Sequence, residues 1–487
     1  MSLKNKTVSG LTWSFAGDFI EKIIVFVVGI ILARLLTPRE YGLVGMVTIF
    51  IVLTQPFINS GFSQALIRKQ DCTKTDFSTV FYFNFLVGVV FYILLFFAAP
   101  LISTFFKEPQ LILLTRVIGI IIIIDAATLI QTTILTKNID FKKQSQILVT
   151  SSLLSGGLGI FLAYSGFGVW SLVYKTIAQH TIRSALLWFM NRWVPSREFS
   201  KASFKEMFGF GSNLLISAIL DKLYYNIYNL IIAKFFSARE LGLYSRADMF
   251  KNMASTNISN IISRVSFPVL SNLQDDPESL CANYKKILTN TMFITLILMI
   301  SIAAAAEPLI LTLIGEKWAD AIPYLQLLCF VGIFYPLHAM TRTLLYVYGK
   351  SRLFLNLQIV SKLLTIPAIM VGVFFGIKAM IIGMIAAGAI EYFMKAYYSG
   401  RIAGYSIKEQ IKDLLPIVFL ALFIGATLSL ILYLMKMSPI IILTIQVVTA
   451  IGLTILISHL FKIPEYVFIR SILKEKLGDI RDRRRKK

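Results

Sequence analysis

Long apolar runs separated by short polar segments follow one another along the whole chain. Crossing the hydrocarbon core of a bilayer takes roughly 20 residues of α-helix, and most of the runs reach that length. The pattern therefore predicts an all-α polytopic membrane protein with about 14 transmembrane helices. The predicted helices cover residues 8–35, 41–65, 76–102, 110–136, 144–165, 167–191, 203–235, 240–270, 285–313, 319–349, 352–376, 377–401, 410–435 and 438–461.

One phrase occurs twice in this pattern. Residues 33–43 read ARLLTPREYGL, and residues 233–243, 200 positions further on, read AKFFSARELGL. Copies separated by six predicted helices have the same orientation in a membrane, and parallel repeats of this kind form the two halves of many transporters, with the substrate site between them. We therefore expect two parallel six-helix lobes around a central cavity. The expected parts are 1–200, 201–405, two added helices over 406–461 and a basic tail over 462–487.

The repeated phrase itself has the composition of a turn between two helices. Pro38 ends one helix, the Arg-Glu pair that follows meets water, and Gly42 lets the next helix pack closely. Ala238 and Gly242 take the same places in the second copy. We interpret the phrase as structural, and a direct substrate role for Arg39 or Arg239 is the alternative.

Composition and charge support a membrane protein and argue against nucleic acid as a partner. Hydrophobic residues make up 56% of the chain and charged residues only 15%, which is too apolar for ordinary water-soluble domains. The net charge is +22, but the basic residues lie beside apolar segments and not in a soluble domain. Lysine and arginine collect in alternate loops, which predicts that both termini lie on the cytoplasmic side of the membrane. The C-terminal RDRRRKK is interpreted as an anchor to anionic membrane lipids.

Two further features limit what the chain can be. The three cysteines have no ligand spacing, so we expect neither a metal site nor a disulfide framework. The first apolar run is too long for a cleaved signal peptide, so we expect it to remain as a membrane helix.

Charged residues inside the predicted helices are the candidate functional residues. An ionised side chain costs about 2.5–3.5 kcal/mol at the centre of a membrane helix, so these groups should line water or pair with one another. Basic groups outnumber acidic groups at these positions, which favours an anionic ligand such as a phosphate or diphosphate. The predicted substrate-binding residues are Lys22, Lys222, Arg342, Lys362, Lys175 and Arg246.

Acidic residues and one histidine in the same helices are candidates for coupling transport to H+ or Na+, or for pairing with the basic groups. They are Asp18, Glu21, Asp125, Asp221 and His338. The spacing of four residues between Glu391 and Lys395 predicts an ion pair on one helix. The alternative is that several of these charged residues form structural pairs or reach the membrane surface from helix ends.

The sequence contains no pattern typical of an enzyme active site. Gly349, Lys350 and Ser351 resemble the end of a phosphate-binding P-loop, but Leu344 stands where that motif needs glycine. We therefore expect a protein that is not an enzyme, has no cofactor and draws energy from an ion gradient, the substrate gradient or another protein.

An ordered series of segments resembles a known family. The segments are ARLLTPREYGL (33–43), GFSQALIRKQD (61–71), KEP (107–109), FKKQSQ (141–146), GFGVWSLV (166–173), LGLYSRA (241–247), SRVSFPVLSNLQDDPE (263–278) and GEKWADAIPYLQLL (315–328). On these the chain resembles the polysaccharide-export branch, of the colanic-acid and teichuronic-acid exporter type, of the multidrug/oligosaccharidyl-lipid/polysaccharide (MOP) superfamily.

The resemblance implies a function and partners. Such proteins move undecaprenyl-diphosphate-linked oligosaccharides across the inner membrane by alternating access, for lipopolysaccharide, capsule or exopolysaccharide synthesis. It also implies a polysaccharide polymerase and glycosyltransferases as partners, and it transfers no catalytic residue. The alternative is a cation-coupled multidrug exporter of the same superfamily, which would be expected to have an acidic cavity. A major-facilitator transporter lacks support, because the loop after the second helix reads IRKQDCTK in place of a DRxGRR pattern.

Overall fold

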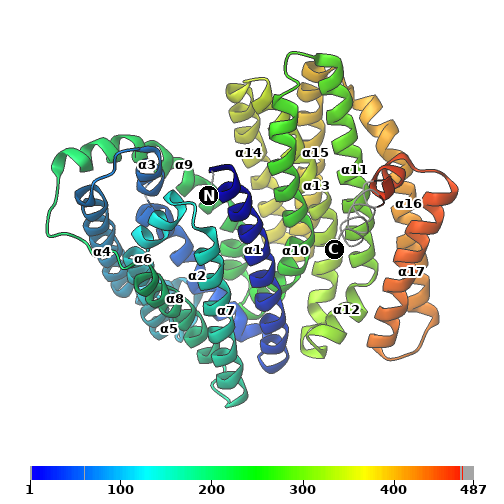
Figure 1. The fold of residues 1–487 in the computed structure, drawn as a ribbon. Helices are drawn as coiled ribbons and strands as arrows, with labels where there is room; N and C mark the ends of the chain where they lie inside the picture. Colours follow the sequence, from blue (N-terminus) through cyan, green and yellow to red (C-terminus); the bar gives the residue numbers. More distant parts are fainter. Residues whose placement is uncertain (1–2, 60, 472–473, 475–487) are drawn as a thin grey trace, which may run out of the picture. The chain divides into compact units, whose positions relative to one another are not determined.

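The regular structure of the described chain is helical throughout (Figure 1). The computed structural model describes residues 3–59, 61–471 and 474, with the backbone alone for residues 3–11, 210–214, 216 and 217. The helices are α1 (Leu3–Leu35), α2 (Pro38–Asn59), α3 (Phe62–Arg68), α4 (Lys74–Phe106), α5 (Leu111–Ile118), α6 (Ile120–Lys137), α7 (Phe141–Tyr164), α8 (Val169–Asn191), α9 (Lys201–Phe235), α10 (Ala238–Ser271), α11 (Pro277–Ala304), α12 (Ala306–Leu313), α13 (Ile322–Val347), α14 (Ser351–Phe375), α15 (Ile377–Ala403), α16 (Ile407–Leu434) and α17 (Pro439–Leu460), with a 3₁₀ helix over Glu316–Ala321.

The prediction of an all-α polytopic membrane protein is confirmed. Each predicted helix coincides with one helix, or with two consecutive helices where a short break divides it. The first break follows α2, where Gly61 has a φ of 68°, a left-handed conformation that glycine adopts without strain. Ten helical segments of the described chain are long and apolar enough to cross a membrane. That fourteen do so remains a prediction.

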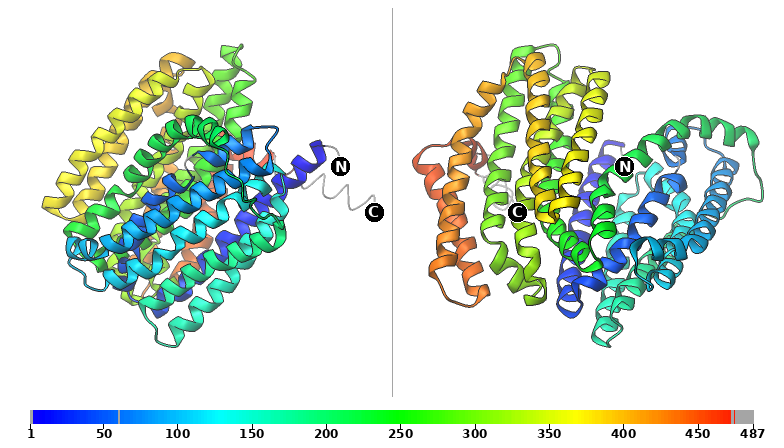
Figure 2. Two further views of the ribbon diagram at one scale, coloured as in Figure 1. Left: turned by 90° about the vertical axis from the view of Figure 1, so that its left-hand side faces the viewer. Right: turned by 180° about the vertical axis from the view of Figure 1, so that it is seen from behind.

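The helices form two compact units, residues 1–242 and residues 243–487. In the first unit, α7 packs against both α1 and α8, α6 packs against α4 and α8, and α9 packs against α2, α3 and α4. In the second unit, α11, α13, α15 and α14 lie side by side, and α16 packs against α11 and α17 (Figure 2). The predicted lobe boundary at residue 200 rests on the repeat and not on packing, and it stays a prediction.

The core of the second unit explains why its helices associate. Large apolar side chains from five helices meet there, among them Tyr284 on α11, Met340 on α13 and Ile424 on α16, each almost fully buried. Ala396 supplies a small surface on α15 at the same place. Small and large side chains that alternate in this way let membrane helices approach closely.

The repeated phrase forms the same helix–turn–helix in both copies. α1 ends at Leu35 and α2 begins at Pro38, as α9 ends at Phe235 and α10 begins at Ala238. The backbone N–H and the hydroxyl of Thr37 donate to Glu40 Oε2 at 2.6 and 2.8 Å, while the Glu40 N–H lies 3.4 Å from Thr37 Oγ1. This reciprocal arrangement is a capping box, which satisfies N–H groups at the start of α2.

The second copy repeats half of this capping box. There the Glu240 N–H donates to Ser237 Oγ at 3.1 Å. The Thr/Ser-x-Arg-Glu core of the phrase is thus a helix start, a signal that was readable in the sequence. Arg39, expected to meet water, is exposed but also pairs with Glu108, Nη2 to Oε2 at 2.9 Å.

The two copies of the phrase also pack against each other. A Cβ atom on Gly42 would lie 1.6 Å from the carbonyl oxygen of Ala238, and one on Gly242 would lie 1.8 Å from the carbonyl oxygen of Pro38. The contact is therefore reciprocal, backbone on backbone. It supports the interpretation of the phrase as structural and gives its two glycines a specific role.

Candidate functional site

Asp125 lies at the centre of a polar cluster built by three helices of the first unit. Its Oδ1 atom is 2.6 Å from Nδ1 of His180 on α8. Its Oδ2 atom accepts a hydrogen bond of 2.9 Å from Nε2 of Gln55 on α2. Asp125 and His180 are about three-quarters buried, with side-chain exposures of 24% and 27%. Both carboxylate oxygens are therefore held by nitrogen groups from neighbouring helices.

The Asp125–His180 contact requires a proton between its two atoms. A carboxylate oxygen and an unprotonated imidazole nitrogen both carry lone pairs and would repel each other at this distance. Either the His180 N–H donates to the carboxylate or a protonated Asp125 donates to the ring. One proton is therefore shared between the Asp125 carboxylate and the His180 ring.

Helix packing around Asp125 explains why the cluster forms. One residue along α6, Ala126 is buried against α4, where a Cβ on Gly88 would lie only 2.6 Å from the Ala126 Cβ. One turn further along, the Thr128 hydroxyl donates to Ser184 on α8 at 2.8 Å. These contacts fix α6 between α4 and α8 and bring Asp125 to His180.

The sequence analysis identified Asp125 but missed His180 and Gln55. A histidine next to Gln179 in a predicted membrane helix was a usable signal for His180. Its pairing with Asp125 was not readable, because 55 residues separate the two and only the packing of α6 on α8 joins them.

A second polar group joins α1, α7 and α8 in the same unit. Lys175 Nζ lies 3.4 Å from Gln179 Oε1, and Gln179 Nε2 lies 3.3 Å from the Ser152 hydroxyl on α7. Glu21 on α1 is a hydrogen-bond partner of Ser152 and interacts electrostatically with Lys22 and Lys175. Three predicted site residues, Glu21, Lys22 and Lys175, therefore belong to one electrostatic group.

A small polar cavity lies beside this group. It has a volume of about 200 Å³, and its lining includes Asp18 on α1, Thr132 on α6, Gln144 on α7 and Arg183 on α8. A water molecule occupies about 30 Å³ of liquid, so the cavity has room for several. The predicted residue Asp18 thus faces a space large enough for water inside the first unit.

Asp221 and Lys222, both predicted site residues, lie on α9, in the first unit with Lys22. Both side chains are exposed. α9 packs against α2, α3 and α4, whereas α1 packs against α7, so Lys22 and Lys222 lie on helices with different neighbours. Their joint role in a substrate site stays a prediction.

In the second unit, His338 lies beside the predicted Glu391–Lys395 pair. That pair is confirmed, with the Lys395 ammonium bonded to Glu391 Oε1. His338 Nε2 is 3.5 Å from Glu391 Oε2, and its ring stacks on Phe334. The other ring nitrogen, Nδ1, is buried without a hydrogen-bond partner in the described part of the chain. The ring thus lies beside the Glu391 carboxylate and stacks on an aromatic ring at one place.

The remaining predicted basic residues differ in burial. Arg246 is only 8% exposed, and its guanidinium lies 5.9 Å from the centre of the Trp318 ring, a cation–π contact typical of structural packing. Lys362 is half-buried on α14 and Arg342 is exposed on α13. Lys251 was not among the predicted site residues, yet it is only 1% exposed, with Nζ 2.6 Å from Asp248 Oδ1 and 3.1 Å from the Tyr335 hydroxyl.

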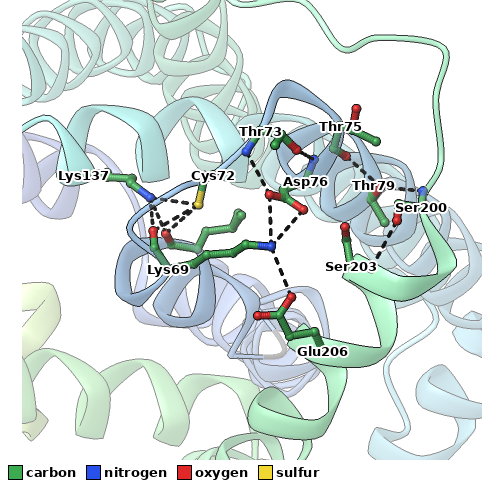
Figure 3. Close-up of polar contacts among 11 residues, drawn as sticks. Lys69, Cys72, Thr73, Thr75, Asp76, Thr79, Lys137, Ser200, Ser203 and Glu206 are labelled. Atoms are coloured by element: carbon green, nitrogen blue, oxygen red, sulfur yellow. Dashed lines mark hydrogen bonds and ion pairs between the residues drawn. The ribbon is translucent and has the colours of Figure 1, made fainter.

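A polar network ties the start of α9 to the loop before α4 (Figure 3). Lys69 Nζ lies between Asp76 Oδ1 at 3.3 Å and Glu206 Oε2 at 3.1 Å. The hydrogen bond with Glu206 raises the pKa of Lys69. On the other side of this loop, Lys137 Nζ donates a hydrogen bond of 2.9 Å to the Leu66 carbonyl oxygen. The network holds the predicted cytoplasmic end of the first unit together.

The comparisons with known proteins agree with this fold. The family model for polysaccharide biosynthesis proteins matches residues 31–323. The teichuronic acid biosynthesis protein TuaB of Bacillus subtilis (strain 168) is 26% identical over 357 residues, which are 72% of this chain and 73% of TuaB. The lipopolysaccharide biosynthesis protein WzxC of Escherichia coli (strain K12) is 26% identical over 378 residues, 76% of each chain.

The fold is similar to that of solved structures. The lipid II flippase MurJ in its inward closed conformation superposes with a TM-score of 0.72 at 16% identity, covering 92% of this chain and 98% of MurJ. An inward-facing multidrug resistance transporter of the MATE family, in the MOP superfamily, gives a TM-score of 0.60 at 15% identity, covering 79% and 94%. Both of these solved structures are of transport proteins. The chain belongs to the polysaccharide biosynthesis protein family.

Proposed function

We propose that this protein moves a polyprenyl-diphosphate-linked oligosaccharide from the cytoplasmic to the outer leaflet of the bacterial inner membrane, for the synthesis of a surface polysaccharide. The observation that carries the proposal is the family match over residues 31–323, with relatives named for teichuronic acid and lipopolysaccharide biosynthesis. The likeness to a lipid II flippase supports a fold suited to a lipid-linked glycan. A polymerase and glycosyltransferases would act on the same glycan before and after transport.

The electrostatic group on α1 and α8 supports an anionic ligand. Glu21 is the anion that interacts with both Lys22 and Lys175. A diphosphate carries more negative charge than one carboxylate, so it would displace Glu21 from the two cations and bind in its place. Arg342 and Lys362, also predicted to bind the substrate, belong to the second unit.

The Asp125 cluster supports the proton as the coupling ion. A hard cation such as Na+ needs several oxygen ligands, as other hard cations do. Both carboxylate oxygens of Asp125 are already in hydrogen-bond contact with nitrogen atoms, one of His180 and one of Gln55. Proton binding at Asp125 and His180 would change the charge of a largely buried group and so favour one transport state over another.

A cation-coupled multidrug exporter is the second candidate, because a MATE transporter has the same fold. The family match and the basic groups at membrane depth favour the glycan lipid. Removal of the gene separates the two. We expect a lipid-linked oligosaccharide to accumulate in the cytoplasmic leaflet, while sensitivity to cationic drugs stays unchanged. Increased drug sensitivity without such accumulation would favour the multidrug exporter.

A further inference from the structure

An open pocket of about 1010 Å³ lies in the second unit, away from the polar clusters described above. α11, α16 and α17 form its walls, together with the segment that follows α17. Its lining combines Lys285, Lys286 and Lys412 with several phenylalanine side chains. A cationic region and an apolar region therefore belong to one pocket.

The two regions are separated along the helices. Lys285 and Lys286 lie near the start of α11, and Lys412 lies near the start of α16. Phe419 and Phe423 follow Lys412 by seven and eleven residues, which places all three side chains on one face of α16. At a rise of 1.5 Å per residue, the distance from Lys412 to Phe423 along the helix is roughly 16 Å. This is about half of the 30 Å hydrocarbon thickness, the depth of one leaflet.

The apolar part of the pocket is open, and its large side chains are exposed. Phe419, Phe423 and Phe461 are 62%, 55% and 77% exposed, although each is large and apolar. Apolar side chains at the surface of a membrane protein contact lipid tails, and here they line a pocket that also holds lysines. Acyl chains would fill this region along the face of α16.

Positive charge dominates the other end of the pocket. Lys285 is paired with Asp413, Nζ to Oδ2 at 2.8 Å. Lys286 Nζ lies 3.9 Å from the centre of the Phe468 ring, a contact that leaves its positive charge uncancelled. Lys412 is exposed beside Asp413. The remaining carboxylate of the lining, Glu465, is 8% exposed.

We propose that this pocket binds one anionic glycerophospholipid of the cytoplasmic leaflet. Its phosphate would lie between Lys286 and Lys412, and its acyl chains would cover Phe419 and Phe423. Basic pockets between helices at the cytoplasmic side recognise anionic headgroups in this way. The chain's own C-terminal segment does not suit the pocket, because RDRRRKK carries the same sign of charge as the lysines. The inference does not depend on which substrate the protein moves.

The test measures lipid bound to the full-length protein in detergent by native mass spectrometry. Phosphatidylglycerol, phosphatidylcholine and undecaprenyl diphosphate are titrated separately. The test variant is Lys286→Gln with Lys412→Gln. The matched control is Lys201→Gln with Lys205→Gln, two exposed lysines near the start of α9. A Phe419→Ala, Phe423→Ala variant removes the apolar wall and keeps the charge.

We expect the wild type to prefer phosphatidylglycerol and the test variant to bind it roughly 30-fold more weakly, since each lysine near an anionic surface contributes a factor of roughly five. The control should match the wild type, and the phenylalanine variant should bind both phospholipids more weakly. Equal binding of the two phospholipids by the wild type, or equal loss in test variant and control, would overturn the inference. Weaker binding of undecaprenyl diphosphate alone by the test variant would also overturn the inference, because the pocket would then be a substrate site.

Discussion

Asp125 Oδ1 lies 2.6 Å from His180 Nδ1, and this contact joins α6 to α8 inside the first unit. The pair is the most direct candidate for coupling transport to protons. Asp125→Asn should keep a polar group of the same shape at this position but remove the ionisable carboxylate. In proteoliposomes, we expect this variant to lose the stimulation that a pH gradient gives the wild type, with transport falling toward the rate without a gradient.

The control for this experiment is Asp71→Asn, an exposed aspartate in the same unit. It should respond to the gradient as the wild type does. His180→Gln should behave like Asp125→Asn. Full stimulation of Asp125→Asn by the gradient would remove this pair from the coupling mechanism.

Substitutions in the group on α1 and α8 should change ligand affinity in opposite directions. Lys175→Gln removes a cation and should weaken the binding of radiolabelled undecaprenyl diphosphate by about fivefold, the effect of roughly 1 kcal/mol. Glu21→Gln removes the competing anion and should tighten binding. If both variants weaken binding equally, the group has only a structural role.

The contact between the two copies of the repeated phrase should be sensitive to one methyl group. Gly42→Ala or Gly242→Ala places a Cβ within 2 Å of a carbonyl oxygen, so backbone must shift. Overpacking of this kind costs about 1–3 kcal/mol, so the midpoint of thermal unfolding in detergent should fall clearly. Gly157→Ala is the matched control, because a Cβ on Gly157 meets nothing within 4 Å. A drop of equal size in the control would show that the contact is unimportant.

The Lys69–Glu206 contact should stabilise the first unit in a pH-dependent way. The pKa of Lys69 is raised above its usual 10.5, so its contribution is complete below the unfolded pKa and is lost as pH rises through the folded pKa. Glu206 is 63% exposed, so the contribution is only about 0.2–1 kcal/mol. The difference in unfolding midpoint between wild type and Glu206→Gln should therefore shrink at strongly alkaline pH. A difference that is constant with pH would contradict this account.

Much of the fold could be predicted from the sequence because hydropathy and turn chemistry act locally. The predicted helices match the observed ones, and the Glu391–Lys395 pair follows from spacing on one helix. The Thr37–Glu40 capping box was also within reach of a local pattern. Burial was less predictable: Arg246 is packed on Trp318, a contact between helices that are distant in sequence.

The candidate site could be predicted only in part. Asp125 stood out because an acid inside an apolar helix is costly without a partner. Its partners Gln55 and His180 lie 70 and 55 residues away, and only tertiary packing brings them together. The lipid pocket could not be predicted from sequence either, because Lys286 and Lys412 come from helices whose association no local pattern specifies.

The most direct test of the central claim is transport by the purified protein in proteoliposomes. Undecaprenyl-diphosphate-linked oligosaccharide is placed in one leaflet, and its appearance in the other is measured with and without a pH gradient. We expect faster translocation in vesicles with protein than in protein-free vesicles, and further acceleration by the gradient. Translocation at the protein-free rate for every lipid-linked glycan tried, under either condition, would contradict the proposed function.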